Sequence, residues 1–173
     1  SGGGRMGAVA TNTCYNNLDI TTLGTFNQAF SGGFSPINCF NLNTTKAAGG
    51  ITLTDPALFS TVSAKNDINI TYSGTAALVA NSNTVQVGHN WNNSGTAYFT
   101  EGTASTVEFN GTGAQVLNCP GGENFANFTM TNTGSGLSLA NTLFVTGVGT
   151  FTSGLVNNTA TNLMTFGNAG STT

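Results

Sequence analysis

Short runs of alternating apolar and polar residues recur along the second half of the chain. Thr106-Val-Glu-Phe109 and Leu163-Met-Thr-Phe166 are clear examples, and such alternation is typical of strands that bury one face. Turn clusters such as Asn110-Gly-Thr-Gly113 separate the runs, because Asn and Gly tolerate the left-handed backbone of tight corners. No window shows the apolar spacing of an amphipathic helix. The pattern therefore predicts an almost entirely β chain.

The runs also repeat at a regular distance. Comparable strands begin roughly 16 to 22 residues apart, a period that indicates stacked coils. A unit this short cannot bury its own apolar side, so it must stack on its neighbours. We expect a parallel β-helix, or β-solenoid, with Val, Ile, Leu, Phe and Met inside and Thr, Ser, Asn and Gln outside. Asparagines at equivalent turns of successive coils can then form side-chain ladders.

The domain organisation follows from the same alternation. Shorter and less regular strands are expected in the first half, for example at Leu18–Ile20, Cys39–Leu42 and Ile68–Ile70. No linker rich in Pro or charge interrupts the chain, so we expect one solenoid over residues 18–173. The Gly-rich residues 1–17 are expected to form a lead-in or cap. Because no closing coil follows Gly167, we expect the solenoid to continue beyond Thr173.

Composition narrows the possible partners. Only 5% of the residues are charged, against roughly 25% in ordinary globular proteins. The basic residues are Arg5, Lys46 and Lys65, too few for a nucleic-acid footprint. Apolar residues make up 38% and include 12 Phe, which argues against disorder. No apolar run approaches the roughly 20 residues of a membrane-spanning helix. We therefore expect neither a nucleic-acid partner nor a membrane-spanning segment.

Two stretches resemble a known kind of repeat. Gly88-His-Asn-Trp-Asn-Asn-Ser-Gly95 and Ser105-Thr-Val-Glu-Phe-Asn-Gly-Thr-Gly-Ala-Gln115 are similar to "G-N-W-x-N-x-G" and "T-V-x-F-x-G-x-x-x-Q". These phrases occur in very large cell-surface β-helix proteins and adhesins of Bacteroidota. The likeness extends over residues 85–170, and residues 1–80 match less closely. It implies a parallel β-helix, secreted to the outer cell surface of a Gram-negative bacterium, often by type 9 secretion. The implied partners are the secretion machinery, cell-surface components, glycans or other surfaces.

Three functions are compatible with these observations. The favoured hypothesis is a structural or adhesive segment, a stalk or adhesin with a possible role in gliding or attachment. A second is an extracellular filament subunit whose open solenoid ends stack head to tail. A third is a carbohydrate-active enzyme, which needs a pair of carboxylates. Glu101 and Glu123 form the best candidate pair, but we expect both to be solvated turn residues, and we expect no enzymatic activity.

His89 and Trp91 are the candidate binding residues. Their side chains could stack against a sugar ring, because an aromatic face offers flat apolar area. The alternative, which we favour, is that Trp91 caps the coil interior and His89 lies on the surface. His89 is the only histidine, so neither Ser/His/Asp nor Cys/His catalysis can be assembled convincingly.

The chain has three cysteines, Cys14, Cys39 and Cys119. Their spacing fits no metal-binding pattern, so neither a metal nor another cofactor is expected. Cys14 and Cys39 could form a disulfide in an extracellular protein, which would leave Cys119 unpaired within the chain. The alternative is three buried thiols, since a free cysteine behaves as a small hydrophobic residue.

Overall fold

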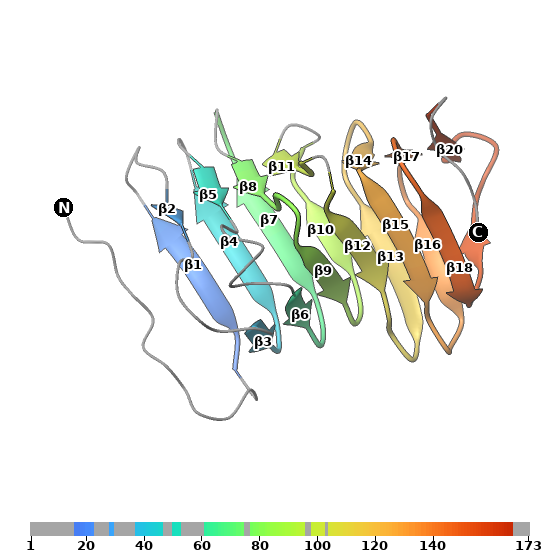
Figure 1. The fold of residues 1–173 in the computed structure, drawn as a ribbon, viewed down its shortest axis with the longest axis horizontal. Coiled ribbons are helices and arrows are strands. Elements are labelled where there is room, and N and C mark those ends of the chain that lie inside the picture. Colours follow the sequence, from blue (N-terminus) through green and yellow to red (C-terminus); the bar gives the residue numbers. More distant parts are fainter. Residues whose placement is uncertain are drawn as a thin grey trace.

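The strands of this protein follow one another in a regular stack, shown by a computed structural model (Figure 1). The structure describes residues 16–22, 28–29, 37–46, 50–52, 61–74, 77–95, 98–102 and 104–167. Within these residues there are twenty strands and no α-helix. In the described part of the chain, no helix has the length and apolar character needed to cross a membrane.

Three successive strands make one coil, and each strand of a coil belongs to a different side of the solenoid. Side A consists of β1 (Leu18–Thr22), β4 (Leu42–Lys46), β7 (Ile68–Tyr72), β10 (Trp91–Asn93), β13 (Ala114–Asn118), β16 (Gly136–Leu139) and β19 (Val156–Asn157). Side B begins with β2 (Gln28–Ala29), β5 (Gly50–Thr52), β8 (Ala77–Val79) and β11 (Phe99–Thr100). It continues as a separate sheet of β14 (Glu123–Phe125), β17 (Leu143–Val145) and β20 (Met164–Phe166). Side C consists of β3 (Ile37–Cys39), β6 (Thr61–Ala64), β9 (Thr84–Val87), β12 (Thr106–Phe109), β15 (Asn127–Thr131) and β18 (Gly149–Ser153).

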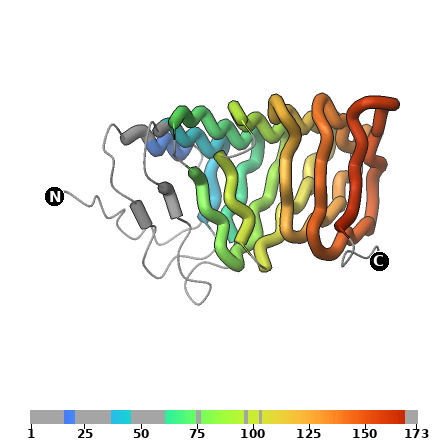
Figure 2. Tube along the Cα trace, turned by 90° about the horizontal axis from the view of Figure 1, so that it is seen from above, coloured from blue at the N-terminus to red at the C-terminus, as the bar shows by residue number. Residues whose placement is uncertain are grey.

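Except between β11 and β14, the strands pair in parallel with the equivalent strand of the next coil, which confirms the predicted parallel β-solenoid. Figure 2 shows the coils stacked from the N-terminal to the C-terminal end. The early coils are longer than the predicted period, since Ile51 pairs with Leu78. The last coils fall within that period, since Leu137 pairs with Val156. The variation lies in the corners, because the ladder fixes the strands but leaves corner length free.

Alternate residues of each strand point into the stack. β6, β9 and β12 each show the sequence half-buried, buried, half-buried, buried. Val62, Val85 and Val107 lie in register and are almost completely buried. Stacked apolar side chains therefore form one continuous core along the axis, which is the stabilisation that a single coil lacks.

Asparagine ladders run along side A, both at a corner, as predicted, and on the strands themselves. On its outer face, Asn43 Nδ2 donates to Asp19 Oδ1 (2.6 Å), and Asn69 Nδ2 donates to Asn43 Oδ1 (2.7 Å). Asn92 Nδ2 continues the column by donating to Asn69 Oδ1 (2.9 Å). At the corner before side A, a second ladder links Asn17, Asn41 and Asn66. The two ladders join successive coils outside the core as well as inside it.

Two boundary predictions have different outcomes. β1 begins at Leu18, and residues 1–15 of the predicted lead-in lie outside the described residues. The predicted strand Cys39–Leu42 is wrong, because β3 ends at Cys39 and β4 begins at Leu42. Phe40 and Asn41 form the corner between them, and Phe40 is 45% exposed. A polar residue next to an exposed aromatic residue looks like strand alternation in the sequence, although the chain turns there.

Candidate functional site

Glu123 is the chemically most distinctive residue of the described chain. It begins β14, where alternate residues point inward, and its side chain is only 1% exposed. Its in-register neighbour in the next coil is Leu143, which is fully buried. The expectation of a solvated turn residue is therefore wrong for Glu123. Strand β14 starts directly after the Gly121–Gly122 turn, and this start places the carboxylate inside the stack.

Three donors meet the buried carboxylate. Trp91 Nε1 and Asn93 Nδ2 both donate to Glu123 Oε2, each at 2.7 Å. The backbone N–H of Asn124 donates to Oε1 at 3.1 Å. Trp91 and Asn93 are alternate, inward-facing residues of β10, one coil before Glu123. The carboxylate therefore ties two successive coils together through their interior.

The thiol of Cys119 completes this group, and we call Trp91, Asn93, Cys119 and Glu123 the Glu123 cluster. Cys119 is fully buried, and its Sγ donates to the carbonyl oxygen of Gly122 at 2.9 Å. Burial raises the pKa of Glu123 from its usual value of 4.5 to about 7, against the opposing effect of hydrogen bonds from Asn93, Trp91, Asn124 and Cys119. Removing an ionised carboxylate from water is costly, so desolvation favours the neutral acid.

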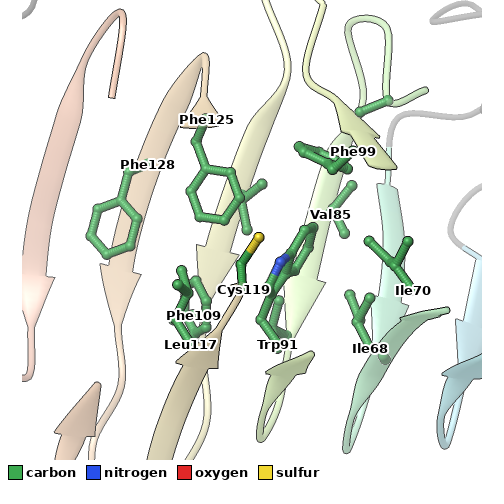
Figure 3. Packing of buried hydrophobic residues seen from close by; sticks show 14 of the residues in the cluster. Ile68, Ile70, Val85, Trp91, Phe99, Phe109, Leu117, Cys119, Phe125 and Phe128 are labelled. Atoms are coloured by element: carbon green, nitrogen blue, oxygen red, sulfur yellow. The ribbon is translucent and has the colours of Figure 1, made fainter. Parts of the chain in front are cut away.

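Aromatic rings pack against Trp91 of the cluster (Figure 3). The indole of Trp91 meets Phe99 and Phe125 edge to face, with ring centroids 4.9 Å and 5.1 Å away. Phe99 and Phe125 also meet edge to face, at 5.8 Å. Such contacts are worth about 0.5–1.5 kcal/mol each beyond the area that they bury. The carboxylate thus lies in apolar surroundings.

The cluster lies beside an interruption of side B. β11 ends one sheet and β14 begins the next, so no ladder of backbone hydrogen bonds joins these two strands. Trp91 and Asn93 on one coil and Glu123 on the next supply side-chain hydrogen bonds close to this break. We call the missing β11–β14 ladder the side-B break. The hydrogen bonds of the cluster replace part of the coil-to-coil bonding that a continuous ladder would provide.

The structure separates the two candidate binding residues. Trp91 is 0% exposed, so its ring does not reach a sugar at the surface. His89 lies outside, 46% exposed, with its Nδ1 2.8 Å from Asp67 Oδ1. This contact becomes an ion pair when His89 is protonated. The two side chains therefore do not share a surface.

The candidate carboxylate pair does not form an accessible site either. Glu101 follows β11 and is half-buried, whereas Glu123 is enclosed and hydrogen-bonded to Trp91 and Asn93. A glycosidic bond has to reach both carboxylates from solvent. The geometry of this pair therefore gives no support to carbohydrate cleavage.

Gln115 is a structurally important residue that the sequence analysis missed, although Gln115 ends one of the repeat phrases. Gln115 is fully buried, and its Nε2 donates to the carbonyl oxygens of Val87 (2.8 Å) and His89 (2.9 Å). Its Oε1 accepts from Gly111 N (3.2 Å) and Asn132 Nδ2 (2.8 Å). One amide thus satisfies four polar groups at a buried corner, which explains why a glutamine suits this position.

The cysteine prediction remains open. Cys14 lies outside the described residues, so the Cys14–Cys39 disulfide stays a prediction. Cys39 is buried, with its Sγ 3.7 Å from the carbonyl oxygen of Ser63. Among the residues that the structure describes, no group of three or more His, Cys, Asp or Glu side chains could hold a metal ion.

Comparisons with family models, curated proteins and solved structures give no significant match to this chain.

The geometry of the Glu123 cluster limits what the cluster can do chemically. A buried carboxylate hydrogen-bonded to Trp91 and Asn93 can exchange a proton and hold coils together, but it is not placed to act on an external substrate.

Proposed function

We propose that this chain is a structural and adhesive segment, a stalk or adhesin, of a secreted cell-surface β-helix protein. The observation that carries the proposal is the parallel stacking of coils through ladders on three sides. Successive coils are joined by backbone hydrogen bonds, outer asparagine ladders and a continuous core. This architecture supports a stiff, extended body that presents its sides rather than a compact site.

The outer faces support contact with other surfaces. On side C, outward residues form an in-register row of Thr61, Thr84, Thr106 and Asn127. Side A presents the asparagine column. With a net charge of −3, the solenoid has little long-range electrostatic attraction or repulsion. These faces suit short-range hydrogen bonding to glycans or other polar surfaces.

The repeat phrases support membership of the Bacteroidota surface-protein class and export by type 9 secretion. Trp91 and Asn93 of the first phrase both donate to Glu123, and Gln115 of the second holds a buried corner. The residues that carry the resemblance therefore have interior, coil-joining roles. Such roles are what a repeat needs, whichever surface the whole protein contacts.

A head-to-tail filament is the second candidate, and the exposed apolar side chains of the last coils favour it. Leu155 is 70% exposed. Exposed apolar side chains at one end of the stack could pack against a second subunit in a head-to-tail arrangement. The side chains concerned are Phe144, Val148, Phe151, Leu155 and Leu163.

The test uses antibodies raised against this chain and applied to the bacterium that produces it. We expect surface labelling of intact cells, loss of labelling after added protease, and a native polypeptide several times heavier than 17.5 kDa. A native polypeptide of the same mass as this sequence, assembled in long polymers, would favour the filament instead. Labelling only after cell lysis would refute both.

Adhesion is measured with beads that carry the chain, on polysaccharide-coated and bare glass. Two variants place a positive charge on different faces, Thr71→Lys on side A and Thr84→Lys on side C. Loss of attachment with one variant identifies the contact face. Wild-type beads that attach no better than beads carrying an unrelated β protein would refute the adhesive role.

A further inference from the structure

We propose that Glu123 is a pH-sensitive brace of the solenoid, taking up and releasing a proton inside the stack and so setting how firmly the coils beside the side-B break are held. The inference goes beyond the proposed adhesive role and does not depend on it. It concerns a carboxylate that is enclosed, shared between two coils and adjacent to the missing β11–β14 ladder.

The geometry gives each protonation state a different energy. Oε2 accepts two hydrogen bonds of 2.7 Å, from Trp91 and Asn93. A proton bound on Oε1 would leave both of these bonds in place. The ionised form strengthens these bonds but places a negative charge in the interior of the stack, where Glu123 is 1% exposed and its in-register neighbour is the buried Leu143. No cationic side chain lies within ion-pair distance of Glu123 among the residues that the structure describes. The charge is therefore not compensated by a counter-ion, whereas the neutral acid keeps its donors without this cost.

The neighbouring elements carry few groups that titrate near neutral pH. From β10, Trp91 and Asn93 face the carboxylate, and neither ionises in this range. Leu143 of β17 is the in-register neighbour, and the buried Cys119 thiol approaches from the preceding corner. Other ionisable groups next to these elements are the half-buried Tyr98 and Glu101 around β11, and the outer His89–Asp67 pair before β10.

The direction of the pH effect follows from the folded and unfolded states. Burial raises the pKa of Glu123 to about 7 in the folded chain, so the folded chain binds this proton more tightly than the unfolded chain does. The stabilisation is complete below about pH 4.5 and is lost as the pH rises through about 7. Glu123 therefore stabilises the stack more in mildly acidic medium than in mildly alkaline medium.

Trp91 provides a direct readout, because it is the only tryptophan of the chain and its indole N–H contacts the titrating oxygen. Tryptophan emission is recorded between pH 4 and 9 for the wild type, Glu123→Gln and a matched control, Glu101→Gln. We expect an emission transition with a midpoint near pH 7 in the wild type and the control, and none in Glu123→Gln. The urea midpoint is expected to fall from pH 5 to pH 8 in the wild type more than in Glu123→Gln.

A transition that persists in Glu123→Gln would overturn the proposal, and so would a wild type without a transition in this range. If Glu123→Gln does not fold, carbon NMR of the wild type decides. The chain has three glutamates, so their side-chain carboxyl carbons give three titration curves. One curve with a midpoint above pH 6 supports the brace, and three curves with midpoints near 4 to 5 refute it.

Discussion

The close approach of coils at the corner between sides C and A gives a sharp prediction. A Cβ added at Gly88 would lie 2.0 Å from the carbonyl oxygen of Lys65 and 2.5 Å from its carbonyl carbon, in the preceding coil. Gly88 is absent from the residues with positive φ, so alanine could adopt its backbone conformation. The cost of Gly88→Ala therefore comes from the contact alone, and we expect the variant to be clearly less stable.

The size of the stability loss follows from the backbone groups that the added methyl group would displace. The backbone of Gly88 donates to the carbonyl oxygen of Ala64 at 2.8 Å, and that of His89 donates to Asn66 at 2.9 Å. Separating the coils enough for a methyl group stretches both bonds, and over-packing of this kind costs about 1–3 kcal/mol. The smaller entropy of the unfolded alanine chain returns about 0.4–1 kcal/mol. The net loss is on the order of 1 kcal/mol, or roughly 2–4 °C in Tm for a chain of this size.

Gly113 is the matched control, because it lies in the equivalent corner of the next coil and a Cβ there meets nothing within 4 Å. We expect Gly113→Ala to be as stable as the wild type or more stable, by about 0.4–1 kcal/mol. Gly134→Ala should repeat the loss of Gly88→Ala, since its Cβ would lie 2.2 Å from the carbonyl oxygen of Thr112. Thermal unfolding followed by circular dichroism compares the three variants. Equal Tm values for Gly88→Ala and Gly113→Ala would refute the coil contact described here.

Three further predictions concern the interior, the outer ladder and the thiols. Gln115→Met keeps the volume but removes four hydrogen bonds at a buried corner. The carbonyl oxygen of Val87 keeps its bond from Asn110 N, and Asn132 Nδ2 keeps its bond to Gly113 O. We expect a loss of about 3 kcal/mol in urea unfolding, against little change for Gln86→Met on the outer face; a loss as small as that of Gln86→Met would refute the network. Asn69→Ala removes two ladder bonds and should cost about 1 kcal/mol in the same assay, and an unchanged urea midpoint would show that the ladder adds no stability. Alkylation of the denatured, unreduced chain tests the predicted Cys14–Cys39 disulfide by mass, since one modified thiol supports it and three exclude it.

The alternation of apolar and polar residues was sufficient to predict the class of fold. Alternation in segments such as Thr106–Phe109 assigns the inner and outer residues of a strand without knowledge of its partners, and β12 has this burial pattern. Recurring turns rich in Asn and Gly implied stacking, and stacking implied asparagine ladders at the corners, such as Asn66 to Asn41. These features depend only on neighbours along the chain and on repetition, both of which the sequence contains.

Only the tertiary structure decided the surroundings of Glu123. In the sequence it follows two glycines, which suggested a solvated turn, but pairing in register with Leu143 turns its side chain inward. Its donors Trp91 and Asn93 belong to the preceding coil, far away along the chain. Coil length varies at the corners, so the sequence repeat alone does not fix which residues meet across coils. The alternation determined which faces are buried, whereas register across coils determined which polar groups meet inside.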